Sequence, residues 1–427
     1  MPILTVVMIM RDEADWLPAC LESVRAIADN IVIGDTGSTD TSIAIAQRYG
    51  VKVVPVPWTN DFAAARNSVL AEAHGDWLLH MDADENLELH GAATIRALID
   101  DDGRGADAIE VTLGNYCDDV RAWRWVACAT DDPNARGRTG YIAVPLLRLF
   151  RNHCGYHYRE PVHENITESV MESGGVIGQA HDILIHHHGF GKGGPEKAAR
   201  YLDIARQKVA LRPDDAKAWH DLAEQLVSMD RAGQAREAAQ RALQCDAHHI
   251  AAATTLANIM LNNGELDPAR KFLEPFAETP NAPPHVLIAL CAIACKEGRI
   301  EDARLLSDRA IGIAPNNVLA RLTAARACDL LGNFQDSRAH LDRARKIAPA
   351  VEEIIVRCEA HQLRAEAKPL LTENPKRALA TLVAALKLDP EDPLIHAHIA
   401  EVLEALGDPI RACQSRERAF ALAPRFQ

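Results

Sequence analysis

The stretch WLLHMDADE, residues 77–85, decides how the first part of the chain is interpreted. It begins as a short, mostly apolar run typical of a buried strand, and it ends with carboxylates at Asp82, Asp84 and Glu85. A second apolar run, residues 31–34, ends in the same way at Asp35, about fifty residues earlier. Two acidic strand ends in one α/β region predict a site for a nucleotide and a divalent metal ion.

Residues 3 to about 85 alternate between strand-like and helix-like patterns. Strands are expected at 3–10, 30–34, 51–55 and 77–81, and helices at 15–26, 39–49 and 62–73. This order predicts a mostly parallel, Rossmann-like sheet with helices on both faces, whose ligands bind outside the carboxyl ends of the strands. Further strands are expected at 108–113, 123–128, 144–150 and 182–186.

From about residue 195 the chain becomes helical, rich in alanine and repetitive. Gly264, Gly298 and Gly332 are 34 residues apart. Alanines recur at two other positions of this 34-residue period, and prolines recur at a further position. One of the two alanine sets is Ala235, Ala269, Ala303, Ala378 and Ala412. This pattern resembles the tetratricopeptide repeat, in which two helices touch at small residues and proline follows the second helix. Six units are expected, with a seven-residue insertion at 352–358, and they start at Ala216, Ile250, Pro284, Val318, Glu359 and Pro393.

These patterns divide the chain into three parts. Residues 1–190 form the expected α/β domain, residues 191–215 a linking half-repeat helix, and residues 216–427 an all-α solenoid. Each repeat buries its apolar stripe only against its neighbours, so the array should form an arc with an extended groove. Such a groove usually has a protein or peptide partner, although a fold does not fix a function.

Composition argues against several classes of protein. The 60 acidic and 46 basic side chains give a net charge of -14, which disfavours binding to nucleic acid. No apolar stretch reaches the roughly 18 to 20 residues that a membrane span requires. The ten cysteines have no paired CxxC spacing, which favours a reduced, cytoplasmic location.

The first 190 residues resemble family 2 glycosyltransferases, the inverting sugar transferases of the GT-A fold. The resemblance depends on an ordered set of motifs, at residues 7–13, 33–40, 61–67, 75–85, 162–164 and 185–190. Joined to the repeats, this domain looks like a bacterial branch in which some relatives glycosylate peptides. The resemblance implies a nucleotide-sugar donor, UDP-linked by preference, and a Mn2+ or Mg2+ ion.

The motifs suggest which residues bind the donor. Breaking the bond between sugar and phosphate leaves a nucleoside diphosphate, whose growing negative charge needs a cation or preorganised donors. By resemblance, Asp84 holds the metal, Asp82 contacts ribose or metal-bound water, and Asp35 accepts a hydrogen bond from the base or ribose. Ser38 or Thr39 could also cap the helix beginning near Asp40. The expected nucleotide-sugar-binding set is Arg11, Glu13, Asp35, Gly37, Arg66, Asn67 and Asp82.

Two of these residues have alternative roles. Arg11 and Arg66 could reach the diphosphate or instead order the acidic loop, since a guanidinium suits both partners. Glu13 could equally form a structural ion pair.

Inversion by a single displacement needs a general base beside the acceptor. Glu164 is the preferred base because it matches a His-Glu pair of the family, and His163 would orient or replace it. A surface salt bridge is the alternative role for Glu164. On sequence alone the rival bases are Asp118, Asp119, Asp131 and Asp132.

Three consecutive histidines, His186, His187 and His188, end the region. Alternation along a strand would point His186 and His188 to one side and His187 to the other. The resemblance aligns His187 with a histidine expected to bind the metal, and both His187 and His188 stay candidates.

The leading hypothesis is a metal-dependent inverting glycosyltransferase of the hexosyltransferase type, acting on a protein, peptide or glycan acceptor that the solenoid helps to select. The alternative is a repeat scaffold whose first domain is inactive. A nucleotidyltransferase is disfavoured because residues 11–15 lack glycine, and a zinc hydrolase because HExxH spacing is missing after His163. A processive polysaccharide synthase would add transmembrane helices.

Overall fold

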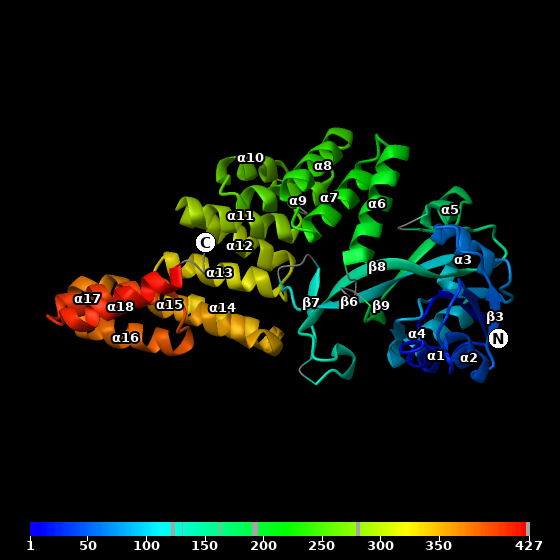
Figure 1. The fold of residues 1–427 in the computed structure, drawn as a ribbon, viewed down its shortest axis with the longest axis horizontal. Coiled ribbons are helices and arrows are strands. Elements are labelled where there is room, and N and C mark those ends of the chain that lie inside the picture. Colours follow the sequence, from blue (N-terminus) through cyan, green and yellow to red (C-terminus); the bar gives the residue numbers. More distant parts are fainter. Residues whose placement is uncertain (121–123, 130, 162–163, 190–194, 279–281, 424–427) are drawn as a thin grey trace. The chain divides into compact units, whose positions relative to one another are not determined.

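The computed structural model describes residues 1–120, 124–129, 131–161, 164–189, 195–278 and 282–423 (Figure 1). The chain divides into two compact units. The first comprises residues 1–126 and 132–197, and the second comprises residues 198–427 together with 127–131. None of the helices in the described ranges combines the length and the apolarity needed to cross a membrane.

The first unit is built on one sheet, to which nine strands of the described residues contribute. The strands are β1 (Leu4–Met10), β2 (Asn30–Asp35), β3 (Lys52–Pro55), β4 (Trp77–His80), β5 (Glu85–Leu87), β6 (Ala108–Cys117), β7 (Trp125–Ala127), β8 (Gly140–Arg151) and β9 (Ile177–His187). Their order across the sheet is β3-β2-β1-β4-β8-β6-β9-β5, and β7 pairs with β8.

The first four strands are parallel, as predicted, and their register brings their carboxyl ends to one edge. Met10 lies opposite Asp35 in the β1–β2 pair, and Val7 lies opposite His80 in the β1–β4 pair. Beyond β4 the sheet becomes mixed, because β8 runs antiparallel to both β4 and β6. The loops that follow β1, β2 and β4 therefore share one rim.

Helices cover both faces of this sheet (Figure 1). They are α1 (Leu17–Val24), α2 (Ser42–Arg48), α3 (Phe62–Leu70), α4 (Leu89–Asp100) and α5 (Thr167–Glu172). Side chains alternate along β1, so that Val6 and Met8 pack in the core containing α1, α2 and α4, whereas Val7 packs in the core containing α3 and α5. Burial on both faces explains why β1 is an almost continuous apolar run.

A glycine in β2 allows α3 to lie close to the sheet. A Cβ atom on Gly34 would lie 2.5 Å from Cγ2 of Val69 in α3 and 2.9 Å from Cγ2 of Val56. Both distances are well below van der Waals contact, so a larger residue here would push the helix outward. Because α3 carries Arg66 and Asn67, Gly34 controls how near these side chains come to the rim.

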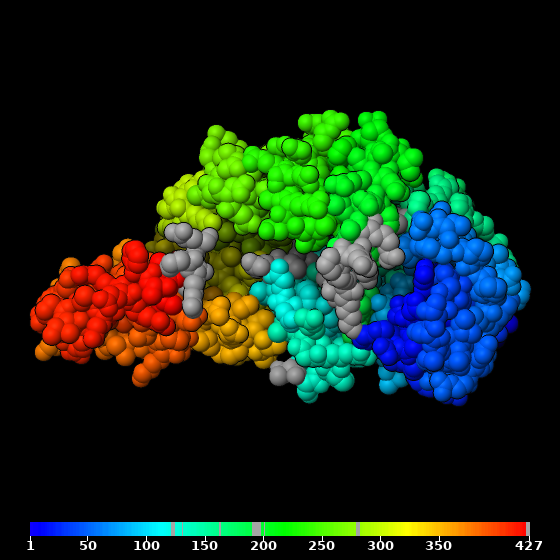
Figure 2. Space-filling model, viewed as in Figure 1, coloured from blue at the N-terminus to red at the C-terminus, as the bar shows by residue number. Residues whose placement is uncertain are grey.

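The second unit is a helical solenoid that opens with α6 (Pro195–Leu211). In the described residues, helix pairs follow one another in chain order, from green to red in Figure 1. Figure 2 shows the surface of the same unit in the same colours. The pairs are α7 (Ala216–Ser228) with α8 (Ala232–Cys245), α9 (Ile250–Asn262) with α10 (Leu266–Ala277), α11 (Pro284–Glu297) with α12 (Ile300–Ile313), α13 (Val318–Leu330) with α14 (Phe334–Ile347), α15 (Glu352–Glu373) with α16 (Pro375–Leu388), and α17 (Pro393–Ala405) with α18 (Pro409–Leu422).

The alanine phase predicted to mark helix contacts is buried throughout. All five of its members have no exposed surface: Ala235, Ala269, Ala303, Ala378 and Ala412. The expected unit start at Glu359 is wrong, because residues 352–358 form the first turns of α15 rather than a separate insertion. Acidic Glu352 and Glu353 in the first turn and fully buried Ile355 favour this longer helix.

We predict that Gly34→Ala lowers the free energy of unfolding of the first unit by about 1–3 kcal/mol, because the added methyl group overpacks the α3 contact. Urea unfolding followed by tryptophan fluorescence measures this change. Gly312→Ala in α12 is the control. Its Cβ meets no atom within 4 Å, so it should stabilise the protein slightly by restricting the unfolded chain. Equal stability of wild type and Gly34→Ala would contradict the packing argument.

Candidate active site

The end of β2 forms a tight acidic turn at the rim. Asp35 accepts hydrogen bonds from the backbone N–H of Gly37 at 3.1 Å and of Ser38 at 3.2 Å. Gly37 has a φ of 108°, which glycine tolerates best. Arg11, which follows β1, keeps about half of its side chain exposed (54%) and lies 3.9 Å from the Asp12 carboxylate. Arg11 is thus accessible to a ligand at this edge.

The loop after β1 is joined to the loop after β2 by hydrogen bonds. Ser38 Oγ accepts from the N–H of Asp12 at 3.0 Å, and Thr39 Oγ1 donates to Asp12 Oδ1 at 3.1 Å. The expected capping of α2 by Ser38 or Thr39 is therefore wrong, because non-local partners occupy both hydroxyls. The helix begins at Ser42, whose Oγ accepts from the N–H of Glu13 at 2.8 Å. These bonds fix the part of the rim that carries Glu13.

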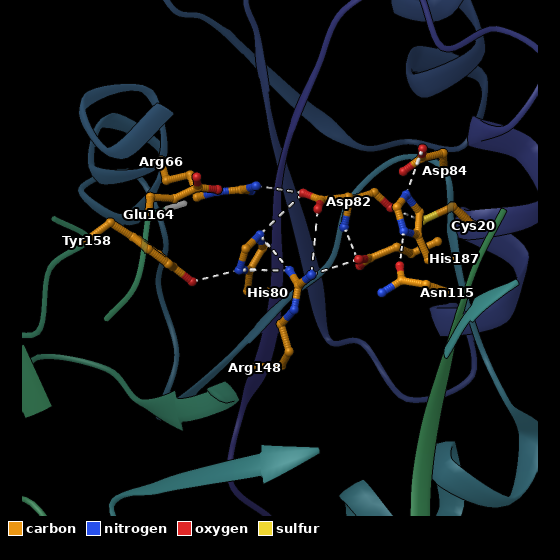
Figure 3. Close-up of polar contacts among 11 residues, drawn as sticks. Cys20, Arg66, His80, Asp82, Asp84, Asn115, Arg148, Tyr158, Glu164 and His187 are labelled. Atoms are coloured by element: carbon orange, nitrogen blue, oxygen red, sulfur yellow. Dashed lines mark hydrogen bonds and ion pairs between the residues drawn. The ribbon is translucent and has the colours of Figure 1, made fainter. Parts of the chain in front are cut away.

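The acidic loop between β4 and β5 sends Asp82 and Asp84 toward different partners (Figure 3). Asp82 Oδ1 lies 2.8 Å from Arg66 Nη2, and Oδ2 lies 3.6 Å from Arg148 Nη2. Burial alone would raise the pKa of Asp82, but the two guanidinium groups hold that pKa well below its usual range. Asp82 is therefore a carboxylate already balanced by arginine.

Arg66, in α3, joins this loop to the segment that contains Glu164 (Figure 3). Its Nε donates to Glu164 Oε1 at 2.7 Å, while Nη2 donates to Asp82. The Arg66 side chain is 8% exposed and that of Glu164 is 14% exposed, so this ion pair is not a surface salt bridge. Nη1 of Arg66 has no hydrogen-bond partner among the described residues. Arg66 thus orders the acidic groups, one of its two predicted roles.

Asn67 holds the same segment through its backbone. Its Oδ1 accepts from the N–H of Tyr158 at 2.7 Å, and its Nδ2 donates to the Tyr158 carbonyl at 2.9 Å. The N–H of Phe62 also donates to the Pro161 carbonyl at 2.9 Å. Both ends of the Asn67 amide are therefore bonded to the backbone of Tyr158 rather than directed to a ligand.

Unlike Asp82, which pairs with arginines, Asp84 contacts the imidazole ring of a histidine. Its Oδ2 lies 3.3 Å from His187 Nε2, while His187 Nδ1 donates to Asn115 Oδ1 at 2.6 Å. Burial opposes protonation of His187, but the neighbouring Asp84 carboxylate raises its pKa. The backbone of Gly189 lies so close to Asp84 that a Cβ atom on Gly189 would be 1.9 Å from Asp84 Oδ2.

A carboxylate oxygen and an imidazole nitrogen that converge in this way suit a borderline-hard divalent cation. Asn115 fixes the histidine tautomer that directs Nε2 toward such an ion. Over the described ranges, no group of three or more His, Cys, Asp or Glu side chains is arranged to hold a metal ion. Asp84 and His187 would therefore supply two ligands, with the remainder coming from phosphate oxygens or water.

His186 and His188 point to the other side of the strand, as alternation predicted. His188 stacks between Trp16 at 5.8 Å and Tyr116 at 5.2 Å, measured between ring centroids. His186 Nδ1 lies 2.6 Å from the Tyr116 hydroxyl. This arrangement favours His187 over His188 as the metal ligand.

Sequence reasoning missed a buried polar group beneath the acidic loop. The Tyr158 hydroxyl donates to His80 Nδ1 at 2.7 Å, and His80 Nε2 lies 3.3 Å from Asp82 Oδ1. Burial, reinforced by Arg148 and Arg66, lowers the pKa of His80 well below its usual range, so the ring is neutral. A polar residue inside each of two apolar strands, His80 and Arg148, is the signal that could have revealed this group.

Two of the rival candidates for a general base, Asp118 and Asp132, have structural partners. His163 is outside the described residues. Asp118 accepts from the N–H of Thr139 at 2.8 Å and from Arg138 at 2.6 Å, and Asp132 caps a short turn at Asn134. The structure therefore brings together Glu164, Arg66, Asp82 and, through the acidic loop, Asp84 with His187.

Comparison with known proteins identifies two regions of the chain. Residues 5–152 match the model of glycosyl transferase family 2, and residues 294–354 match that of the tetratricopeptide repeat. Residues 5–152 are therefore a family 2 glycosyltransferase domain, and the chain joins it to tetratricopeptide repeats.

Three curated relatives share parts of the chain. A TPR repeat-containing protein of Synechococcus elongatus is 32% identical over 217 residues, 49% of this chain and 48% of the relative. An uncharacterized glycosyltransferase of Rickettsia felis is 34% identical over 79 residues, 18% of this chain and 28% of the relative. The SPbeta prophage-derived glycosyltransferase SunS of Bacillus subtilis is 22% identical over 224 residues, 51% and 47% of the two chains. The chain thus spans about half the length, or less, of these relatives.

We predict that Asn67→Ala locally frees the backbone around Tyr158. Loss of both amide bonds leaves the backbone of Tyr158 without its side-chain partner, at a cost of about 1–3 kcal/mol. Hydrogen exchange at the Tyr158 amide should accelerate by about 5- to 150-fold, as that energy implies. Ser68→Ala is the control, because over the described residues Ser68 Oγ bonds within its own helix, to the Ala64 carbonyl. Unchanged exchange at the Tyr158 amide in Asn67→Ala would contradict the proposal that the Asn67 side chain holds this backbone in place.

Proposed function

We propose that this protein is a metal-dependent inverting glycosyltransferase. It takes a sugar from a nucleotide-sugar donor, UDP-linked by preference, and transfers it to a protein, peptide or glycan acceptor that the repeats help to select. The observation that carries the proposal is the pairing of Asp84 with His187 at a rim where Arg66 joins Asp82 to Glu164. Family 2 membership of residues 5–152 supports the reaction class.

The donor would lie along the rim of the sheet. Asp35 accepts a hydrogen bond from the base or ribose, and Asp82 contacts the ribose. Exposed Arg11 reaches the diphosphate, for which a guanidinium is well suited. Asp84 and His187 hold the divalent cation, which when bound would offset the charge that grows on the leaving diphosphate.

The acceptor would approach the face that Glu164 borders. In this proposal Glu164 takes the proton from the acceptor nucleophile as the bond to the sugar forms, on the side opposite the leaving group. Arg66 holds one carboxylate oxygen of Glu164, which orients the group toward the acceptor. Asn67 supports this geometry by fixing the preceding segment at Tyr158.

A cytoplasmic location is part of the proposal. All ten cysteines are free thiols, and several are buried in apolar surroundings. Unpaired cysteines fit a reducing compartment, where disulfides are rare.

Calorimetric titration with UDP, with and without Mn2+, tests the proposal most directly. A transferase should bind UDP with a Mn2+-dependent heat, and a screen of donor hydrolysis with UDP-, GDP- and dTDP-sugars should then identify the base. A repeat scaffold with an inactive first domain would give no metal-dependent heat and no hydrolysis, and that result would overturn the proposal.

We predict that Asp84→Ala lowers sugar transfer by at least about 100-fold, because the cation loses its carboxylate ligand. The change lies in a rim loop and should leave the thermal unfolding midpoint close to that of wild type. Glu22→Ala removes an exposed carboxylate of the same unit and should leave transfer unchanged. Wild-type turnover in Asp84→Ala would refute the metal role.

We predict that Glu164→Gln lowers transfer by about 100- to 10,000-fold, the usual contribution of a general base, while UDP affinity changes by less than about threefold. The amide keeps the shape of the side chain but cannot accept the proton. Glu168→Gln, on an exposed side chain four residues later, is the matched control. Normal transfer in Glu164→Gln would assign the base elsewhere, with His163 as the next candidate.

A further inference from the structure

Arg148 is a buried cation in an otherwise apolar part of β8. Its side chain is 6% exposed, and its neighbours Leu147, Leu149 and Phe150 are buried. Removing a guanidinium from water is costly, and a buried ion pair seldom stabilises a fold more than apolar packing would. The position of Arg148 therefore calls for a role other than stability.

The contacts of Arg148 bracket the acidic loop. Nη2 lies 2.7 Å from Glu85 Oε1, at the first residue of β5. Nη1 lies 3.0 Å from Nδ1 of His80, the last residue of β4 (Figure 3). One side chain thus holds both residues between which the loop of residues 81–84 runs. The loop cannot shift at either end without breaking a buried contact to Arg148.

Glu85 connects Arg148 to Asp82 and His187, which face the site. Its second oxygen, Oε2, accepts from the backbone N–H of Asp82 at 2.8 Å. In the β5–β9 ladder, Glu85 also lies directly opposite His187. The Arg148–Glu85 pair therefore reaches Asp82 through one hydrogen bond and the partner of Asp84 through strand pairing.

Arg148 has hydrogen-bonding capacity that its protein partners do not use. Its Nε has no hydrogen-bond partner among the described residues. Native proteins satisfy most buried donors, so an unpartnered Nε is unusual for a side chain that serves stability alone. With so little exposed surface beneath the loop, Arg148 acts through its neighbours and not on the substrate.

We infer that Arg148 is a positioning residue, which fixes Asp82 and Asp84 for the donor and its cation by holding His80 and Glu85 at the two ends of the acidic loop. This inference rests on the proposed function. It adds to that function a requirement for a buried arginine that makes no contact with the ligands.

The variant Arg148→Met tests the inference. Its affinity for UDP in the presence of Mn2+ is measured by calorimetry, and donor hydrolysis is a second readout. The Kd for UDP should rise about 10- to 100-fold, as is usual when a partner of a metal-site ligand is lost, and the KM for the acceptor should stay near that of wild type. Arg148→Lys keeps a cation near Glu85 but cannot span both partners, so it should recover only part of the affinity.

Arg151→Met is the matched control on the same strand. Arg151 binds Asp102 and Asp107, away from the acidic loop, at 2.7 and 3.2 Å. Its substitution should leave the Kd for UDP unchanged. A Kd in folded Arg148→Met equal to that of wild type would overturn the inference, as would an equal loss of affinity in Arg151→Met.

Glu85→Gln provides a second test where Arg148→Met does not fold. It keeps the side-chain shape but removes the charge, so the Kd for UDP should rise in the same direction. In the double variant the two losses should combine to less than their product, because both residues act as one unit. If Glu85→Gln bound UDP as tightly as the wild-type protein, the inference would be overturned. If the wild-type protein itself showed no Mn2+-dependent UDP binding, the proposed function would be overturned instead.

Discussion

The buried guanidinium of Arg66 is the interaction on which the site depends. It joins Asp82 to Glu164, two carboxylates that lie 16 and 98 residues away from it in the chain. The buried cation would be costly without these two partly buried acids, and each acid would lose its compensating charge without the cation. The proposed donor side and acceptor side of the reaction therefore share one side chain. Its location depends in turn on the close approach of α3 to β2 at Gly34.

The arrangement of the rim was largely predictable, because it follows from strand direction. Parallel strands in register must end at one edge, so acids that directly follow β2 and β4 must lie near each other. The solenoid was predictable for another local reason: the 34-residue period places small residues at every helix contact. Helices begin at the predicted starts Ala216, Ile250, Pro284, Val318 and Pro393. The predicted unit start at Glu359 was wrong because the preceding residues also favour a helix, in which Ile355 is buried.

What could not be predicted arises from long-range contacts. Strand β5 has only three residues, and it exists because it pairs with β9, about a hundred residues later. Ser38 and Thr39 look like helix caps in the sequence, yet they bind Asp12 across the rim. Similarly, nothing local in the run of residues 144–150 shows that Arg148 lies beneath the acidic loop. Polar residues in apolar strands could have indicated an unusual environment, but not the identity of their partners.

The different roles of the neighbouring acids follow from their electrostatic surroundings. In the buried group, two guanidinium groups, of Arg66 and Arg148, face three carboxylates, of Asp82, Glu85 and Glu164. Asp82 therefore has little remaining capacity to attract a divalent ion. Over the described residues, Asp84 has no arginine near its carboxylate and meets His187 instead. Because the chain turns between the two aspartates, Asp82 is balanced by fixed cations, whereas Asp84 lies beside a histidine. Under the proposed function, this division favours Asp84 over Asp82 as the ligand of the divalent ion.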